Sequence, residues 1–180
     1  MSNSEKWDIL FRKFDNTIEK NQKDAEALEQ AKIDEQNRIN ARISSLFGDV
    51  SKSEELLLEK CRELTPYFRE AMKRMNIKDG DWMIKADLPR SIGYEAAERH
   101  LVIMINNGDI SGVHHDTNSK MEYADSETQE NFKVDTNAVI LKNWDKMESK
   151  ILDAVTKELS EYAKKDKERR MAEVKNKYQK

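Results

Sequence analysis

Residues 100–109 read HLVIMINNGD, and this stretch decides the fold class. Its first six residues are rich in β-branched and apolar side chains, which favours a strand over residues 100–105. Asn107-Gly108 follows, and Asn-Gly is the strongest short signal for a β-hairpin. Residues 110–114 are therefore expected to form the returning strand.

Shorter strand signals surround this hairpin on both sides. Residues 82–84 form a short apolar run, and residues 121–124 and 132–134 flank a polar, acidic loop. Asp79-Gly80 marks a turn, and residues 93–99 have room for one helical turn. Residues 79–135 are thus expected to form a small β-rich head.

Residues 1–50 are expected to form one long helix. Apolar side chains recur at steps of four and three, which is the spacing of a heptad seam. The seam is strong at its ends and weak in the middle, where Asn21, Lys32, Glu35 and Arg42 occupy it. Gly48 follows the last apolar pair and predicts the end of the helix.

Two further helical segments flank the head. Residues 51–78 are expected to form a short helix with a kink or break at Pro66, where Thr65 could cap a separate helix. Residues 51–54, SKSE, match a capping box. Residues 136–180 are expected to form one long C-terminal helix, capped by Asp135 or Thr136, with a basic end.

The predicted fold class is α+β, mostly α. Two long amphipathic helices, N- and C-terminal, enclose a short helix and a small head that contains a β-hairpin. This layout resembles that of prefoldin-like chaperone subunits in architecture, and no functional residue is transferred from that family.

The composition excludes several classes of protein. Charged residues make up 37% of the 180-residue chain, against about 25% in ordinary globular proteins, and the net charge is only −3. The only cysteine, Cys61, rules out an internal disulfide. Charges interrupt the apolar residues of MSNSEKWDILFRKFD, and no run is long enough to span a bilayer. We therefore expect no membrane association and a cytoplasmic protein.

Few motifs point to catalysis. The chain lacks a Gly-x-Ser-x-Gly elbow, a Gly-x-x-x-x-Gly-Lys phosphate loop and a Gly-x-Gly-x-x-Gly dinucleotide loop. His114, His115 and Asp116 are candidate metal ligands, which would suit a metal-dependent hydrolase or nuclease. Neighbouring strand residues point to opposite faces, however, so we expect no metal and no cofactor.

The distribution of charge and the spacing of apolar residues predict two interaction surfaces. Residues 101–135 carry a net charge of −5 and residues 164–180 one of +5. We expect partner-binding residues on the acidic head, namely Asn107, Asp109, Glu122, Asp125, Glu127 and Glu130. The helix stripes predict an oligomer interface formed by Trp7, Phe11, Phe14, Ile18, Trp144 and Ile151.

These observations favour a non-enzymatic, elongated, self-associating helical interaction module of the inhibitor, adaptor or scaffold type. Its acidic head would contact a protein partner that is basic or that handles nucleic acid. In the second case this chain would be a bacterial or phage accessory protein that blocks a nucleic-acid-handling enzyme. The metal-dependent hydrolase is one alternative. Direct nucleic-acid binding through the basic C-terminal helix is another, less favoured one.

Overall fold

The computed structural model of the protein describes residues 1–78, 80–93 and 98–179. The chain is 65% helical with 18% strand, which confirms the α+β, mostly α, class. It divides into two compact units, Met1–Leu46 and Phe47–Lys180. Asp79 of the predicted Asp79-Gly80 turn and residues 94–97 of the helical turn predicted in 93–99 lie outside the described residues.

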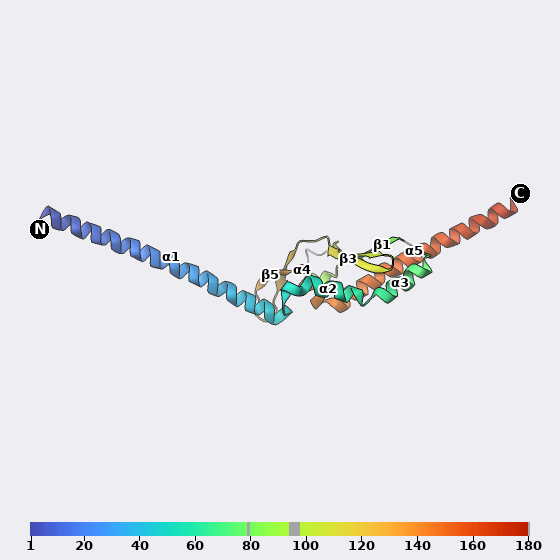
Figure 1. The fold of residues 1–180 in the computed structure, drawn as a ribbon, viewed down its shortest axis with the longest axis horizontal. Helices are drawn as coiled ribbons and strands as arrows, with labels where there is room; N and C mark the ends of the chain where they lie inside the picture. Colours follow the sequence, from blue (N-terminus) through green and yellow to red (C-terminus); the bar gives the residue numbers. More distant parts are fainter. Residues whose placement is uncertain (79, 94–97, 180) are drawn as a thin grey trace. The chain divides into compact units, whose positions relative to one another are not determined.

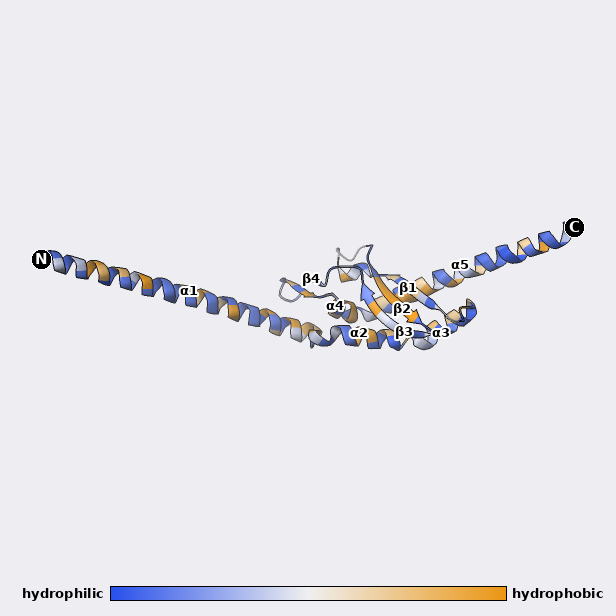
Figure 2. Ribbon diagram, turned by 45° about the horizontal axis from the view of Figure 1, so that its top comes forward, coloured by the Kyte–Doolittle hydropathy of each residue, from blue (hydrophilic) through white to orange (hydrophobic). Residues whose placement is uncertain are grey.

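The first unit consists of one helix. Helix α1 runs over Asn3–Phe47, and none of its residues is buried. Gly48 follows with a φ of +72°, the left-handed conformation in which glycine ends helices. Figure 2 shows apolar and polar bands alternating along α1.

The second unit contains all the strands and the remaining helices (Figure 1). In chain order its elements are the 3-10 helix η1 (Val50–Lys52), α2 (Ser53–Arg62), α3 (Thr65–Arg74), β1 (Asp81–Asp87), η2 (Arg90–Ile92), β2 (His100–Asn106), β3 (Asp109–His115), β4 (Lys120–Ala124), β5 (Asn131–Asp135), α4 (Thr136–Lys142) and α5 (Trp144–Tyr178).

An antiparallel sheet with strand order β1-β2-β3 forms the centre of this unit. Ile84 of β1 and Ile103 of β2 pair directly and are both completely buried. Helix α5 packs against β1, and α2 packs against β3 and α4. One face of the sheet therefore supplies much of the core, as the alternating burial of β1 requires.

The β2–β3 hairpin turns at the predicted residues. Asn107 and Gly108 have φ values of +51° and +84°, the pair of positive values that a type I′ turn needs. A one-residue bulge follows, because Met104 pairs with Gly112 whereas Ile105 pairs with Ile110.

A second, two-stranded sheet joins β4 to β5. Tyr123 and Phe132 pair across it. Phe47, the first residue of this unit, packs edge-on against Tyr123 with ring centroids 4.9 Å apart, and Lys142 lies over the Phe47 ring. These contacts hold the start of the unit against β4 and α4.

The interruption around Pro66 differs in detail from the prediction. Helix α2 ends at Arg62 and α3 begins at Thr65, with Leu64 at the N-cap and Pro66 in the first turn, so Thr65 is not the cap. The predicted capping box is also wrong, since Asp49 caps η1 through the amide of Ser51. Ser53 instead begins α2 and donates from Oγ to Asp135, 82 residues away.

The predicted C-terminal helix is in fact two helices. Asp135 does cap the first, accepting from the Asn137 amide at 2.9 Å, but α4 stops at Lys142. Asn143 adopts φ −107° and ψ 29°, and its side-chain amide donates to Val139 O at 2.9 Å. An asparagine side chain that bonds the preceding turn competes with the helix, so the chain breaks before α5.

The core occupies a limited part of the chain. The buried hydrophobic side chains of the described residues all fall between Leu57 and Ile151. The first turns of α5 contribute Met147 and Ile151, whereas the described residues beyond Ile151 contribute none. The last part of α5 continues past the sheet of its own unit, as Figure 1 shows in red.

Cys61 is predicted to resist thiol reagents in the native protein. Its side chain is fully buried on α2, and burial raises the pKa of its thiol to about 12, so almost no thiolate exists at pH 8. Labelling with a thiol-reactive dye should therefore follow unfolding in urea. Stoichiometric labelling of the folded protein within minutes would contradict the buried placement.

Candidate functional site

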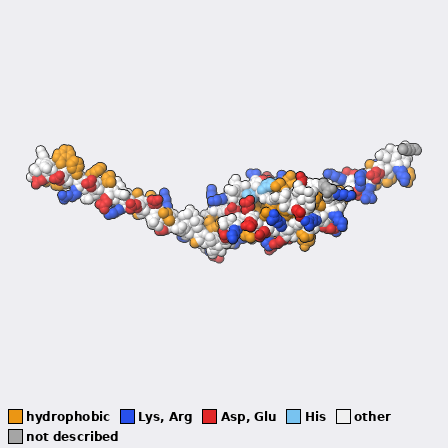
Figure 3. Space-filling model, in the orientation of Figure 1, with side chains coloured by type: hydrophobic (Ala, Val, Ile, Leu, Met, Phe, Trp, Pro, Cys, Tyr) orange, Lys and Arg blue, Asp and Glu red, His pale blue; other side chains and the backbone are white. Residues whose placement is uncertain are grey.

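The first part of α1 carries an exposed apolar stripe. Four seam side chains remain between 49% and 61% exposed, and Figure 3 shows hydrophobic side chains gathered along this part of the helix. Trp7 and Phe11 stack with ring centroids 5.8 Å apart. The seam members are Trp7, Phe11, Phe14 and Ile18.

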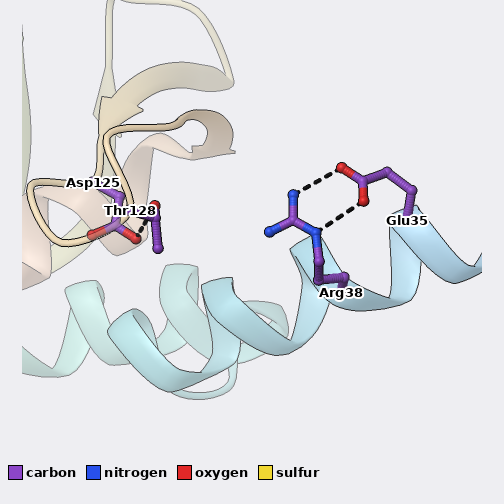
Figure 4. A network of polar contacts seen from close by, with 4 residues as sticks. All are labelled: Glu35, Arg38, Asp125 and Thr128. Atoms are coloured by element: carbon purple, nitrogen blue, oxygen red, sulfur yellow. Dashed lines mark hydrogen bonds and ion pairs between the residues drawn. The ribbon is translucent and has the colours of Figure 1, made fainter.

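In the middle of α1, the polar seam residue Glu35 is paired within the helix. Arg38 donates to both oxygens of Glu35, at 2.9 and 2.8 Å (Figure 4). These bonds lower the pKa of Glu35, which keeps that seam carboxylate charged. Lys23 and Glu19 form another such pair one turn apart. This stretch is thus a polar, internally paired helix surface.

The two interface residues predicted on the C-terminal helix are less available. Ile151 is only 2% exposed in its own chain and belongs to the core, so its assignment to an oligomer interface is corrected. Trp144 is half-buried. Both lie in the first part of α5, where the helix covers the sheet, which sequence periodicity cannot distinguish from a free stripe.

The hairpin tip, predicted to be an acidic contact, is bordered by cations. Arg69 of α3 forms an ion pair with Asp109 and donates to Gly108 O at 3.0 Å. A hollow of about 360 Å³ beside Asn107 is also lined by Lys73 and Lys78. The tip therefore does not present an isolated acidic surface.

Asp125 has a structural role in the β4–β5 loop. It is 2% exposed and accepts from Thr128 Oγ at 2.8 Å (Figure 4). It also accepts from the Glu127 amide at 3.1 Å. Its own amide donates to Glu130 O. A side chain used in this way cannot meet a partner, so its assignment as a partner-binding residue is corrected.

The remaining predicted acidic residues lie nearer the surface. Glu122 is exposed on β4 opposite Lys133 of β5. Glu127 is exposed and Glu130 is half-buried. They stay part of a proposed partner surface, without Asp125.

The three residues of the metal hypothesis do not converge. His114 is exposed and pairs with Val102, whereas His115 is half-buried and pairs with Leu101 of the core. Burial lowers the pKa of His115. Asp116 is held by His100, and across residues 1–78, 80–93 and 98–179 no three His, Cys, Asp or Glu side chains gather as a metal site.

The pair of His100 and Asp116 was not anticipated. His100 Nδ1 lies 2.8 Å from Asp116 Oδ2, its amide donates to Asp116 Oδ1 at 2.6 Å, and its Nε2 lies 3.4 Å from Asp87. Partial desolvation raises the pKa of Asp116, but the hydrogen bonds from His100 outweigh it, so the pKa lies below the usual value. This cluster ties β2 to the end of β3.

An apolar groove lies between the start of α3 and the first half of α5. We call it the α3–α5 groove; it encloses about 460 Å³ and is lined by Leu64, Tyr67, Phe68, Asp145, Glu148, Ser149, Ile151, Leu152 and Val155. Tyr67 and Leu152 are 71% and 64% exposed. Neither residue belongs to the predicted stripes, whereas Ile151 does, so periodicity indicated only part of the groove lining.

The last part of α5, residues 164–178, is called the α5 tail. Met171 and Val174 are each 54% exposed and Tyr178 is 80% exposed. Asp166 accepts from Arg169 and Arg170 at 2.6 and 2.7 Å, and these bonds lower its pKa. The tail is thus a basic helix with an apolar side.

Comparisons with protein-family models, with curated proteins and with solved structures found no match to this chain. Within the described part of the chain, no helix has an apolar stretch that could cross a bilayer. The surfaces described above are therefore the basis for any functional argument.

Asp125→Ala is predicted to destabilise the folded protein by about 2 kcal/mol, because the amide of Glu127 and the hydroxyl of Thr128 lose their acceptor. Glu122→Ala, on exposed β4 nearby, should change stability by less than about 0.5 kcal/mol. Urea unfolding measures both. Equal effects of the two changes would contradict the structural role of Asp125.

Asp116→Asn is predicted to lower stability by about 1 kcal/mol at pH 7, because the charged acceptor of His100 is lost. The folded pKa of Asp116 lies below its unfolded value of about 3.9, so the advantage of the native residue exists above that pH. This stability advantage of the native protein over Asp116→Asn should disappear as the pH falls through the pKa of Asp116 in the folded protein. Urea unfolding at pH 7 and pH 3 tests this.

Asp87→Asn is the matched control for that change, because Asp87 faces the other ring nitrogen of His100 at 3.4 Å and is 71% exposed at its side chain. Its effect at pH 7 should be smaller. A difference between native protein and Asp116→Asn that stays constant from pH 7 to pH 3 would refute the ionic contribution.

Proposed function

We propose that the protein is a non-enzymatic interaction module that self-associates through α1 and presents the β-containing unit to a protein partner. One observation supports self-association above all. A helix of 45 residues has no buried residue, yet its first half carries an aromatic seam about half exposed. Apolar patches of this kind on a helix mark interfaces.

The expected strength of this association is modest. Fully burying a side chain of this size is worth about 1.5–3 kcal/mol, so completing a half-covered one yields about 1 kcal/mol. Four such side chains from each of two copies give about 8 kcal/mol, which is similar to the association cost of about 4–15 kcal/mol. Assembly should therefore depend on concentration.

The polar middle of α1 would affect how the α1 helices of two copies align. Charged residues at seam positions cost stability but specify register and partner orientation in coiled coils. Lys32, Glu35 and Arg42 stand at such positions. In this proposal the aromatic end supplies the affinity, and the polar middle restricts which alignments are compatible.

For the protein partner, we favour the exposed acidic side chains of β4 and the β4–β5 loop, Glu122 and Glu127. A basic partner, including a nucleic-acid-handling protein, would be steered to them by charge, which raises the association rate at low salt. The proposal places the module in the cytoplasm, where a thiol such as that of Cys61 stays reduced.

The enzymatic alternative receives no support from geometry. A hydrolase would need His114, His115 and Asp116 to meet at one point, and these side chains diverge or are already engaged.

The double change Phe11→Glu with Phe14→Glu is predicted to shift the protein toward monomer. It places carboxylates in the seam and removes two of its three exposed aromatic side chains. The matched control is Ile9→Glu with Ile33→Glu, because these residues lie on the same helix, are 41% and 47% exposed, and fall outside the seam. Sedimentation velocity over a hundredfold concentration range measures the outcome.

The control should keep the native association, and circular dichroism should show the same helicity for both variants. A native protein that is monomeric at every concentration would defeat the proposal. So would equal weakening by the seam variant and its control.

A further inference from the structure

The α3–α5 groove has the form of a helix-binding site. Its floor is apolar, from Leu64, Phe68, Ile151 and Val155, and its volume of about 460 Å³ falls within the usual range of about 300–1,000 Å³ for binding pockets. Tyr67 and Leu152 stand at its margin with most of their surface exposed. Such exposure at the edge of a groove leaves apolar area for an occupant to cover.

The charge of the groove restricts what that occupant can be. Asp145 and Glu148, from the first two turns of α5, both line it, and none of the described residues that line it is a Lys or an Arg. An apolar floor with acidic side chains suits an amphipathic helix whose apolar anchors are flanked by cations.

The α5 tail has these properties. Met171, Val174 and Tyr178 follow the i, i+3, i+7 spacing by which helices anchor in grooves, and all three are more than half exposed. Lys164, Lys167 and Lys175 share one side of the helix with Met171, and the acidic Glu168 lies on that side as well. Residues 164–178 contain seven basic and three acidic residues.

The aromatic end of α1 fits this groove less well. Residues 5–15 also carry exposed apolar side chains, but their three basic and three acidic residues cancel. Charge complementarity therefore selects the α5 tail over α1.

The tail cannot reach the groove of its own chain. Leu152 and Val174 lie on the same continuous helix, 22 residues apart, which corresponds to about 33 Å along the axis. An unbroken helix cannot fold back on itself, so the tail that fills a groove must come from another copy.

We infer that the α5 tail of one copy docks in the α3–α5 groove of a second copy, with Met171 and Val174 over the apolar floor and the tail lysines near Asp145 and Glu148. Because each chain carries one tail and one groove, such contacts either close into a ring or continue from copy to copy. This contact is distinct from the α1 seam and does not require it.

Disulfide trapping between two full-length variants tests the contact. One variant carries Leu152→Cys and the other Val174→Cys, both at exposed positions, and a small tag distinguishes their masses. Cys61 can stay because it is buried. The control replaces Leu152→Cys by Asp153→Cys, which is exposed but does not line the groove. Under mild oxidation, the 152–174 pair should form faster than the 153–174 pair and faster than either like pair.

Charge exchange tests the recognition itself. Asp145→Lys with Glu148→Lys in the Leu152→Cys variant should lower trapping about fivefold, as expected for the loss of two partly exposed ion pairs. Lys167→Glu with Lys175→Glu in the Val174→Cys variant should restore it. A reversal without effect, or without rescue, would overturn the inferred contact.

The α1 seam variant, Phe11→Glu with Phe14→Glu, separates this inference from the proposed function. Trapping between 152 and 174 should persist in that background even if sedimentation shows weaker association. Trapping that disappears there would mean the contact is secondary to α1. Faster trapping of Leu152→Cys by Trp7→Cys than by Val174→Cys would assign the groove to α1 and reject the tail.

Discussion

The scarcity of apolar side chains is the constraint on which this structure depends. Only 37% of the residues are hydrophobic and another 37% are charged, so the chain can build one small core. That core draws its buried hydrophobic side chains from the stretch between Leu57 and Ile151. The helices on either side of this stretch keep their apolar residues without burying them, and such residues gain stability only when another surface covers them.

The exposed apolar surfaces differ in charge, and this difference gives them separate roles in our proposals. The aromatic seam of α1 lies in a stretch of balanced charge and is suited to pairing with a like helix. The α5 tail is basic, whereas the α3–α5 groove is lined by Asp145 and Glu148. In both proposed contacts, apolar area would supply the gain in free energy and charge would decide which surfaces meet.

Local sequence was a good guide to the helices and strands but a poor guide to the surroundings of the acidic side chains. Asp125 and Asp109 looked like surface charges because their neighbours in sequence are polar. Asp125 instead organises its own loop, and Asp109 pairs with Arg69, which lies 40 residues earlier in the chain. Composition reports how much charge a segment carries. It does not report which distant side chain neutralises that charge.

Heptad spacing, the Asn107-Gly108 signal and Gly48 by themselves determined the long first helix, the hairpin and the helix end, because each rests on local backbone preference or periodicity. Only the tertiary structure determined the β2–β3 bulge. Without that extra residue His100 would face His115 rather than Asp116, and the two neighbouring histidines would exchange faces. It likewise determined the burial of Ile151 and the groove that Tyr67 and Leu152 both line. Both features follow from packing between segments far apart in sequence, and periodicity within one helix does not report which distant segment packs against it.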